Sequence, residues 1–171
     1  MKLLKKLAAV ALAAVLALSM VGCGNASGVN YTKQFMLNMM ADNVAMYGGE
    51  CHNTPDMDSI AQRLLTEANA AYQGETQTNK AVKALMQAAA NKEGVLNPNT
   101  GYAINFVEDY QFRSSFIPDA EKQDALIRNM EYISVNGGID DDDDEADDLD
   151  IGVAVGKIGD KTYVVMVMMP T

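Results

Sequence analysis

The chain has 171 residues, 13 of them basic and 23 acidic, and its formal net charge is −10 at pH 7. This acidic balance excludes nucleic-acid binding and electrostatic adhesion to anionic lipid, because both need clustered lysine and arginine. With two cysteines and one histidine, the sequence also lacks a disulfide framework and the Cys/His cluster of a zinc site.

Residues 1–22 have the three parts of a bacterial export signal. Three lysines precede an unbroken apolar run over residues 7–18, and a small-residue cleavage region follows. This run is too short for a transmembrane helix, which needs about 20 residues. The segment ends in Leu-Ser-Met-Val-Gly-Cys, which matches a lipobox except for a methionine where leucine is usual. We therefore expect a lipoprotein signal peptide, cleavage before Cys23 and a lipid on that cysteine. The alternatives are a secreted protein that is cut nearby and a retained anchor.

This interpretation places the protein at the bacterial cell membrane, anchored through the lipid on Cys23, on the extracytoplasmic face. Residues 23–30 would be a lipidated flexible tether, whose seven residues after Cys23 reach about 15 Å. Residues 31–171 are expected to form a single domain. Without the signal, 10 basic residues face 23 acidic ones, so the mature chain carries a formal charge of −13.

Apolar spacing predicts three helices in the first part of the domain. The first, over residues 31–47, has a broad apolar face with four methionines, and Thr32 is its candidate N-cap. The second begins at Thr54-Pro55, a strong start signal, and continues to about Tyr72 with apolar residues at three- and four-residue spacing. The third is expected over residues 79–91. The methionines are also candidates for a soft binding surface or a copper site, but a packed core is favoured.

Cys51 and His52 lie in a predicted loop over residues 50–55. Adjacent side chains diverge in an extended chain, and a nucleophile and its base normally come from separate segments. We therefore expect a half-buried or buried cysteine here. We assign no catalytic, cofactor-binding or metal-binding residue, and only Cys23 as a site of modification.

The second part of the domain is expected to be rich in strands. Strands are predicted over residues 102–107 and 132–135, separated by a helix over residues 119–130. A closing hairpin is predicted from residues 151–156 and 162–169, with a turn between them. Because its second strand is apolar on both faces, it should be central in the sheet. Helices first and strands last predict an α+β fold, in which several helices flank a small, mostly antiparallel sheet as an α-β-α sandwich.

Asp140–Asp150 contains nine carboxylates in eleven positions. Such a run repels itself, and a solvated, disordered acidic loop is expected. Weak calcium binding is the alternative, since clustered carboxylates supply hard oxygen ligands. The spacing is not that of an EF-hand loop, which needs alternating ligands and a glycine at its middle.

The order of these elements resembles the CAP superfamily (the cysteine-rich secretory, antigen-5 and pathogenesis-related, or SCP-like, domain). The resemblance is carried by the helix containing Ile60-Ala61-Gln62-Arg63-Leu64-Leu65, the strand Tyr102–Val107, the segment Arg128-Asn129-Met130, and above all the closing hairpin with Ile151-Gly152-Val153. CAP domains commonly bind a divalent ion in a cleft with two histidines and two acidic residues. Here Ile104 stands at the position of one acidic ligand, and Leu126 or Ile127 at that of the second histidine. The resemblance therefore implies a cleft without its metal site.

Three functions compete. The first is a lipid-anchored, non-catalytic, CAP-like module that binds an envelope component or a protein partner. The second is an envelope lipoprotein of another α+β fold, for instance cystatin-like, which acts as an inhibitor or assembly factor; one helix wrapped by an antiparallel meander would distinguish it. The third is a hydrolase, for which only Cys51 and His52 are available. We favour the first and expect that the protein is not an enzyme.

Overall fold

The computed structural model describes residues 28–46, 48–109, 121, 125, 126, 128–138 and 148–171. Cys23, residues 24–27 of the predicted tether, residues 140–147 of the acidic run and much of the predicted helix 119–130 lie outside the described residues. No helix within the described ranges is long and apolar enough to cross a membrane.

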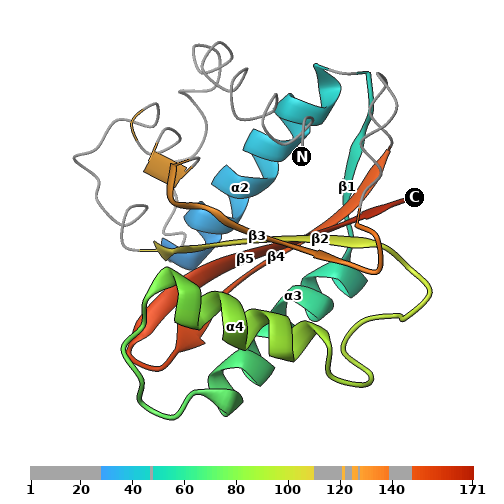
Figure 1. Cartoon of the computed structure of the whole chain (residues 1–171). Helices are drawn as coiled ribbons and strands as arrows, with labels where there is room; N and C mark the ends of the chain where they lie inside the picture. Colours follow the sequence, from blue (N-terminus) through green and yellow to red (C-terminus); the bar gives the residue numbers. More distant parts are fainter. Residues whose placement is uncertain (1–27, 47, 110–120, 122–124, 127, 139–147) are drawn as a thin grey trace.

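The fold is α+β, as predicted, and is built on one five-stranded mixed sheet (Figure 1). The strands are β1 (Cys51–Asn53), β2 (Tyr102–Glu108), β3 (Glu131–Val135), β4 (Leu149–Ile158) and β5 (Lys161–Pro170). Their order in the sheet is β1-β4-β5-β2-β3. β1 and β4 are parallel, and the other three pairs are antiparallel.

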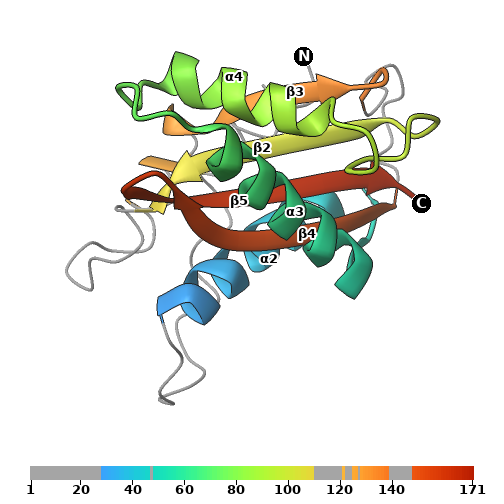
Figure 2. The same cartoon turned by 90° about the horizontal axis from the view of Figure 1, so that it is seen from below.

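Three helices whose bounds lie within the described residues flank this sheet. They are α2 (Gly28–Ala45), α3 (Pro55–Ala71) and α4 (Asn79–Ala90). α3 and α4 cover one face, and α2 lies on the opposite face (Figure 2). Residues 121, 125, 126, 128 and 129 are also helical, in agreement with a helix before β3. Helices on both faces differ from the single wrapped helix of a cystatin-like arrangement.

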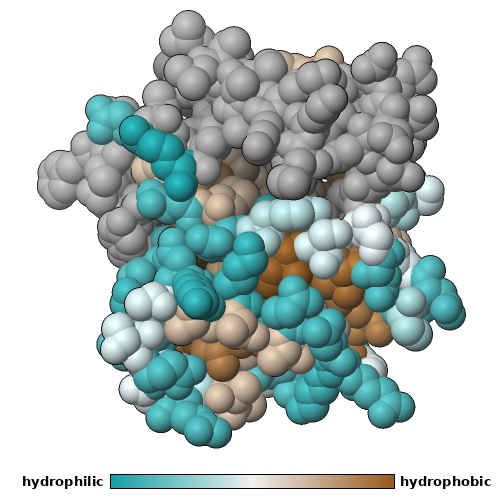
Figure 3. Space-filling model, in the orientation of Figure 1, coloured by the Kyte–Doolittle hydropathy of each residue, from teal (hydrophilic) through white to brown (hydrophobic). Residues whose placement is uncertain are grey.

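Side chains on the two faces of the sheet form two hydrophobic cores. We call the larger one the α3–α4 core: Met57, Ala61, Leu64, Leu65, Ala68, Val82, Met86, Ala89, Ala90, Val95, Tyr102, Ile104, Phe106, Ile133, Val135, Ala154, Ile158, Tyr163, Val165 and Val167. We call the smaller one the α2 core: Met36, Met39, Met40, Val44, Ala103, Val107, Leu126, Leu149, Ile151, Val153, Val164, Met166 and Met168. On the surface in Figure 3, hydrophilic side chains surround smaller hydrophobic areas.

β5 occupies the central position that its sequence predicts. Residues 163–168 are all buried, because β4 and β2 flank the strand within the sheet and helices cover both faces. The glycines of β4 allow close packing against α3. A Cβ atom at Gly152 would overlap the backbone of Met57 in α3. Glycine at this position therefore lets α3 lie directly on β4.

The structure corrects four predicted boundaries. α2 begins at Gly28, so residues 28–30 of the predicted tether are helical, and Thr32 is a buried residue inside the helix instead of its cap. Residues 51–53 form a strand and not a loop, because they pair with β4. β4 begins at Leu149, so the last two residues of the acidic run, Leu149 and Asp150, belong to a strand and not to the predicted loop.

The fourth correction concerns the closing hairpin. Its strands extend to Ile158 and Lys161, so the turn is Gly159-Asp160 and not the five residues 157–161. Gly159 has a φ of +61°, whereas Asp160 does not have a positive φ. A positive φ at the first turn residue only is the pattern of a type II′ turn, which favours glycine there and matches the twist of the strands.

Candidate functional site

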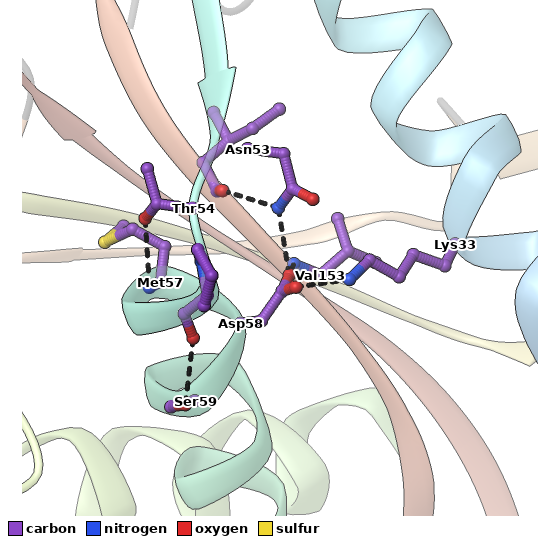
Figure 4. A network of polar contacts seen from close by, with 9 residues as sticks. Lys33, Asn53, Thr54, Met57, Asp58, Ser59 and Val153 are labelled. Atoms are coloured by element: carbon purple, nitrogen blue, oxygen red, sulfur yellow. Dashed lines mark hydrogen bonds and ion pairs between the residues drawn. The ribbon is translucent and has the colours of Figure 1, made fainter.

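The candidate site lies where α3 begins, at the outer edge of β4. Thr54 has extended backbone angles and its hydroxyl oxygen accepts a hydrogen bond from the N–H of Met57 at 3.2 Å, so the predicted N-cap is confirmed. Pro55 occupies the first turn, where its missing N–H costs nothing. This start directs Asp58, in the first turn of α3, towards β4 (Figure 4).

The Asp58 carboxylate joins three elements of the fold. Its Oδ1 atom accepts hydrogen bonds from the N–H of Val153 at 2.9 Å and from Nδ2 of Asn53 at 3.0 Å. Its Oδ2 atom forms an ion pair with Nζ of Lys33, which comes from α2 on the other face of the sheet (Figure 4). One side chain thus bonds α3 to β1, to β4 and to α2 around the strand edge.

These contacts keep Asp58 ionised. Partial burial by itself would raise the pKa of the carboxyl, but the hydrogen bonds from Lys33, Val153 and Asn53 and the charge of Lys33 outweigh burial and lower the pKa below 3.8. A carboxylate with a lowered pKa and donors on both oxygens is a poor general base at neutral pH. Asp58 is therefore suited to hold the edge together, or to take part in binding, and not to transfer protons.

A cavity of about 340 Å³ opens beside this network. Its walls come from α2, from α3 and from the outer edge of β4: Lys33, Asp58, Ser59, Gln62, Val153, Ala154 and Val155. The α3 wall supplies polar side chains and β4 supplies apolar ones. The cavity can therefore accept a ligand with both hydrogen-bonding and apolar groups.

Cys51 and His52 do not form a catalytic pair. They are neighbours in β1, where successive side chains point to opposite faces. Cys51 packs against the α2 core, whereas the His52 side chain is 50% exposed and lies 3.9 Å from Glu50. Burial and the nearby charge of Asp148 raise the pKa of the Cys51 thiol to about 11. The thiol is therefore protonated at neutral pH and is a weak nucleophile.

The methionines of the predicted first helix lie mainly in the interior. Met36, Met39 and Met40 are buried in the α2 core, and Met46 is 42% exposed. Across the part of the chain that the structure describes, no group of three or more His, Cys, Asp or Glu side chains is placed to hold a metal ion. The acidic residues 140–147, which are the candidates for weak calcium binding, lie outside that part.

The positions that the CAP resemblance singles out are placed on two different faces. Ile104 is fully buried in the α3–α4 core, and Leu126 is fully buried in the α2 core. These two side chains therefore do not meet in one cleft. Ile127, the alternative position, lies outside the described residues.

The role of Asp58 was not predicted. In the sequence, Pro55-Asp56-Met57-Asp58 indicates only a helix start with favourable charges near its positive end. The contacts of Asp58 depend on Val153, 95 positions further along the chain, and on Lys33. The only local signal is the acidic residue in the first helical turn, which does not distinguish Asp58 from Asp56.

Comparison with protein-family models, with curated proteins and with solved structures found no match. The function must therefore be argued from the residues and geometry above.

Proposed function

We propose that the protein is a lipid-anchored, non-catalytic binding module on the extracytoplasmic face of a bacterial cell membrane. The membrane is one partner, through the lipid on Cys23, and an envelope component or protein is the other. The observation that carries the binding role is the cavity at the β4 edge. The carboxylate there is fixed by three donors instead of being free for proton transfer.

The chemistry of the other reactive side chains supports binding over catalysis. A hydrolase would need a nucleophile and a base within reach of each other. The sequence offers Cys51 and His52 for these roles, but they point away from each other and the pKa of the thiol is raised to about 11. A binding module makes no such demand on its side chains.

Fractionation of cells tests the anchoring part of the proposal. We expect Cys23→Ala to move the protein from the membrane fraction to the soluble fraction, because the lipid attachment atom is lost. Cys51→Ala is the matched control, since it removes the other cysteine and should leave the protein with the membrane. Intact-mass measurement of the membrane form should show the added lipid on the wild type and on Cys51→Ala. A Cys23→Ala protein that still fractionates with membranes would contradict the proposal.

We also propose that the domain is a CAP-like domain that lacks the metal ligands of that superfamily. This part is supported by the layered order and by the closing hairpin. It requires Ile104 and Ile127 to lie near the same cleft, which a methyl–methyl NOE between them would reveal. Absence of that NOE would remove the CAP part and leave the lipoprotein part standing.

A further inference from the structure

Among the described residues, only part of the outer edge of β4 is paired with another strand. β1 pairs with residues 149–151, and the chain then turns at Thr54 into α3 and leaves the edge. The Asp58 carboxylate accepts a hydrogen bond from the N–H of Val153. Beyond that point, no strand among the described residues pairs with the outer side of Val155 or Lys157.

Three hydrogen bonds determine the direction in which the backbone groups of β4 point. The N–H of Leu149 donates to the carbonyl of Glu50 at 2.8 Å, and the carbonyl of Ile151 accepts from the N–H of Thr54 at 3.3 Å. The N–H of Val153 donates to Asp58. Because the N–H and C=O of one residue lie on the same side of a strand, and the side alternates, those of Val155 and Lys157 also point away from β5. Val155 is half-buried and Lys157 is exposed.

This edge lies between two helices. α3 and α2 lie on opposite sides of β4 (Figure 2), and the cavity at the edge is lined by Ser59 and Gln62 from α3 and by Lys33 from α2. Backbone donors and acceptors at such an edge are matched best by the backbone of another extended chain. A cavity beside Val153 and Val155 with walls from both helices suits a single strand, which needs about 4.8 Å beside β4, better than it suits a second domain.

We propose that β4 receives an extended segment of a partner polypeptide as an added strand, which pairs with Val155 and Lys157. The inference rests on the proposed binding function and names its partner. The segment carries net positive charge, because the mature chain has a formal charge of −13 and attracts cationic partners over long range. The same charge opposes pairing between two copies of this chain.

Binding of a model strand to the full chain in detergent micelles tests this proposal. The probe is a short, end-blocked, fluorescently labelled peptide of alternating valine and lysine, and anisotropy gives its affinity. An alternating valine–glutamate peptide of the same length tests the charge. A valine–lysine peptide with N-methyl groups on alternate residues tests the backbone hydrogen bonds. Hydrogen exchange of residues 152–158 locates the binding.

Two variants of the protein probe the edge itself. Val155→Pro removes the outward N–H but keeps the bonds to β5, and proline is tolerated where its nitrogen faces out of a sheet edge. We expect about tenfold weaker binding of the valine–lysine peptide, the effect of one lost hydrogen bond. Val155→Thr keeps the N–H and should bind as the wild type does. Ser59→Tyr, on the exposed α3 wall, should also weaken binding without altering β4, and melting curves show whether each variant folds.

The expected result is tighter binding of the valine–lysine peptide than of its glutamate and N-methylated counterparts, with new protection in residues 152–158. No binding, binding that both Val155→Pro and Ser59→Tyr leave unchanged, or preference for the glutamate peptide would overturn the proposal. Protection that rises with protein concentration in the absence of peptide would assign the edge to a second copy and overturn it too. Fractionation of Cys23→Ala is independent of β4, so failure of the anchoring proposal is measured separately.

Discussion

The hydrophobic cores on the two faces of the sheet differ in residue composition. In the α3–α4 core, two of the twenty buried residues are methionine, and the rest are mainly aliphatic or aromatic. In the α2 core, five of the thirteen are methionine. Methionine is unbranched and flexible, so it fills irregular space but defines a packing arrangement less sharply than leucine or valine. The difference indicates that side-chain packing is specified more sharply on the α3–α4 face.

Buried polar groups show the same difference. Among the described residues, the buried polar side chains are Thr32, Asn43, Asn105 and Asp109. Thr32 and Asn43 belong to α2, the Thr32 hydroxyl donates to Asp109 at 3.4 Å, and Asn105 alternates along β2 with Ala103 and Val107 of the α2 core. All four therefore lie on the α2 side. Burying polar groups costs stability unless they are hydrogen-bonded, and on this face the Oδ1 atom of Asn43 has no hydrogen-bond partner among the described residues.

Hydrogen bonds define the starts of both helices on the α3–α4 face. α3 and α4 are both capped by threonine, since Thr54 and Thr78 accept hydrogen bonds from backbone N–H groups three residues further on, each at 3.2 Å. Asp58 and Lys33 join the two faces across the β4 edge. Substitutions on one face, on the other, and at this link between them test the difference between the two faces.

The largest effect is expected on the α3–α4 face, from Gly152→Val. A Cβ at this position would overlap the Met57 backbone, and α3 must then move off β4. We expect a loss of more than about 3 kcal/mol in the free energy of unfolding, as for severe overpacking. Gly156→Ala is the control, because its Cβ would lie 3.2 Å from the flexible end of Leu65, and it should cost less than about 1 kcal/mol. Urea denaturation measures both, and equal losses would contradict the close packing of α3 at Gly152.

The link between the faces should be next. Asp58→Ala removes the acceptor of Val153 and Asn53 and the ion partner of Lys33. We expect a loss of about 2–3 kcal/mol, the scale of hydrogen bonds to a charged group. Asp56→Ala is the matched control, since Asp56 is exposed in the same helical turn. It should lower the free energy of unfolding by about 0.3–1 kcal/mol, through the helix dipole alone. Similar losses of thermal stability in the two variants would show that Asp58 stabilises the protein only through the helix dipole.

On the α2 face, one substitution should stabilise the protein. The Oδ1 atom of Asn43 is buried and has no hydrogen-bond partner among the described residues. Asn43→Leu should raise the free energy of unfolding by at most about 1 kcal/mol, because it removes the unsatisfied Oδ1 atom but also the hydrogen bond from Nδ2 to the carbonyl of Met39 at 2.7 Å. Asn69→Leu is the counterpart near the other core, where Oδ1 accepts from the N–H of Gly159 at 2.9 Å, and it should cost about 1 kcal/mol. A loss of stability in Asn43→Leu would show that the α2 face needs this amide.

The last predictions concern pH. Because the folded-state pKa of Asp58 is lowered, its contribution is present above the unfolded-state pKa and is lost as the pH falls through the folded-state value, below 3.8. The pKa of Cys51 is raised to about 11 by burial and Asp148, and that of Tyr163 to about 12 by burial and by Glu108, Asp160 and Tyr72. The contributions of Cys51 and Tyr163 to stability are present below their ordinary pKa values of 9.0 and 10.0. They are lost as the pH rises through the raised pKa values of the folded state.

Single substitutions separate these alkaline contributions. Cys51→Ala should reduce the loss of stability that begins near pH 9. Tyr163→Phe should reduce the loss of stability that begins near pH 10. Chemical denaturation from pH 7 to 12 measures both against the wild type. An unchanged alkaline profile in both variants would rule out these two groups as its source.

Much of the fold follows from local patterns. Thr54-Pro55 marks the start of α3, and the spacing of Ile60, Leu64 and Leu65 predicts which face of that helix is buried. The run of apolar residues from Tyr163 predicts that β5 is central. These predictions hold because caps and side-chain periodicity act over a few residues.

Other features depend on contacts between distant segments. Cys51–Asn53 is too short to be identified as a strand, and it becomes one by pairing with β4, 98 positions later along the chain. The start of β4 at Leu149, inside an acidic run, is set by the same pairing. The site shows this most clearly, since Asp58 is distinguished from Asp56 only by the partners that tertiary structure brings to it.

By itself, the sequence determined the α+β class, the flanking helices and the closing hairpin, because these depend on periodicity, capping and turn chemistry along a continuous segment. It also predicts the lipid anchor at Cys23, which fractionation can test. Only the tertiary structure decided that α2 and α3 meet around the edge of β4 and that no strand among the described residues pairs with Val155 and Lys157 beyond β1. The physical reason is that a strand edge and its partners are defined by which segments lie next to each other, and no local pattern specifies that arrangement.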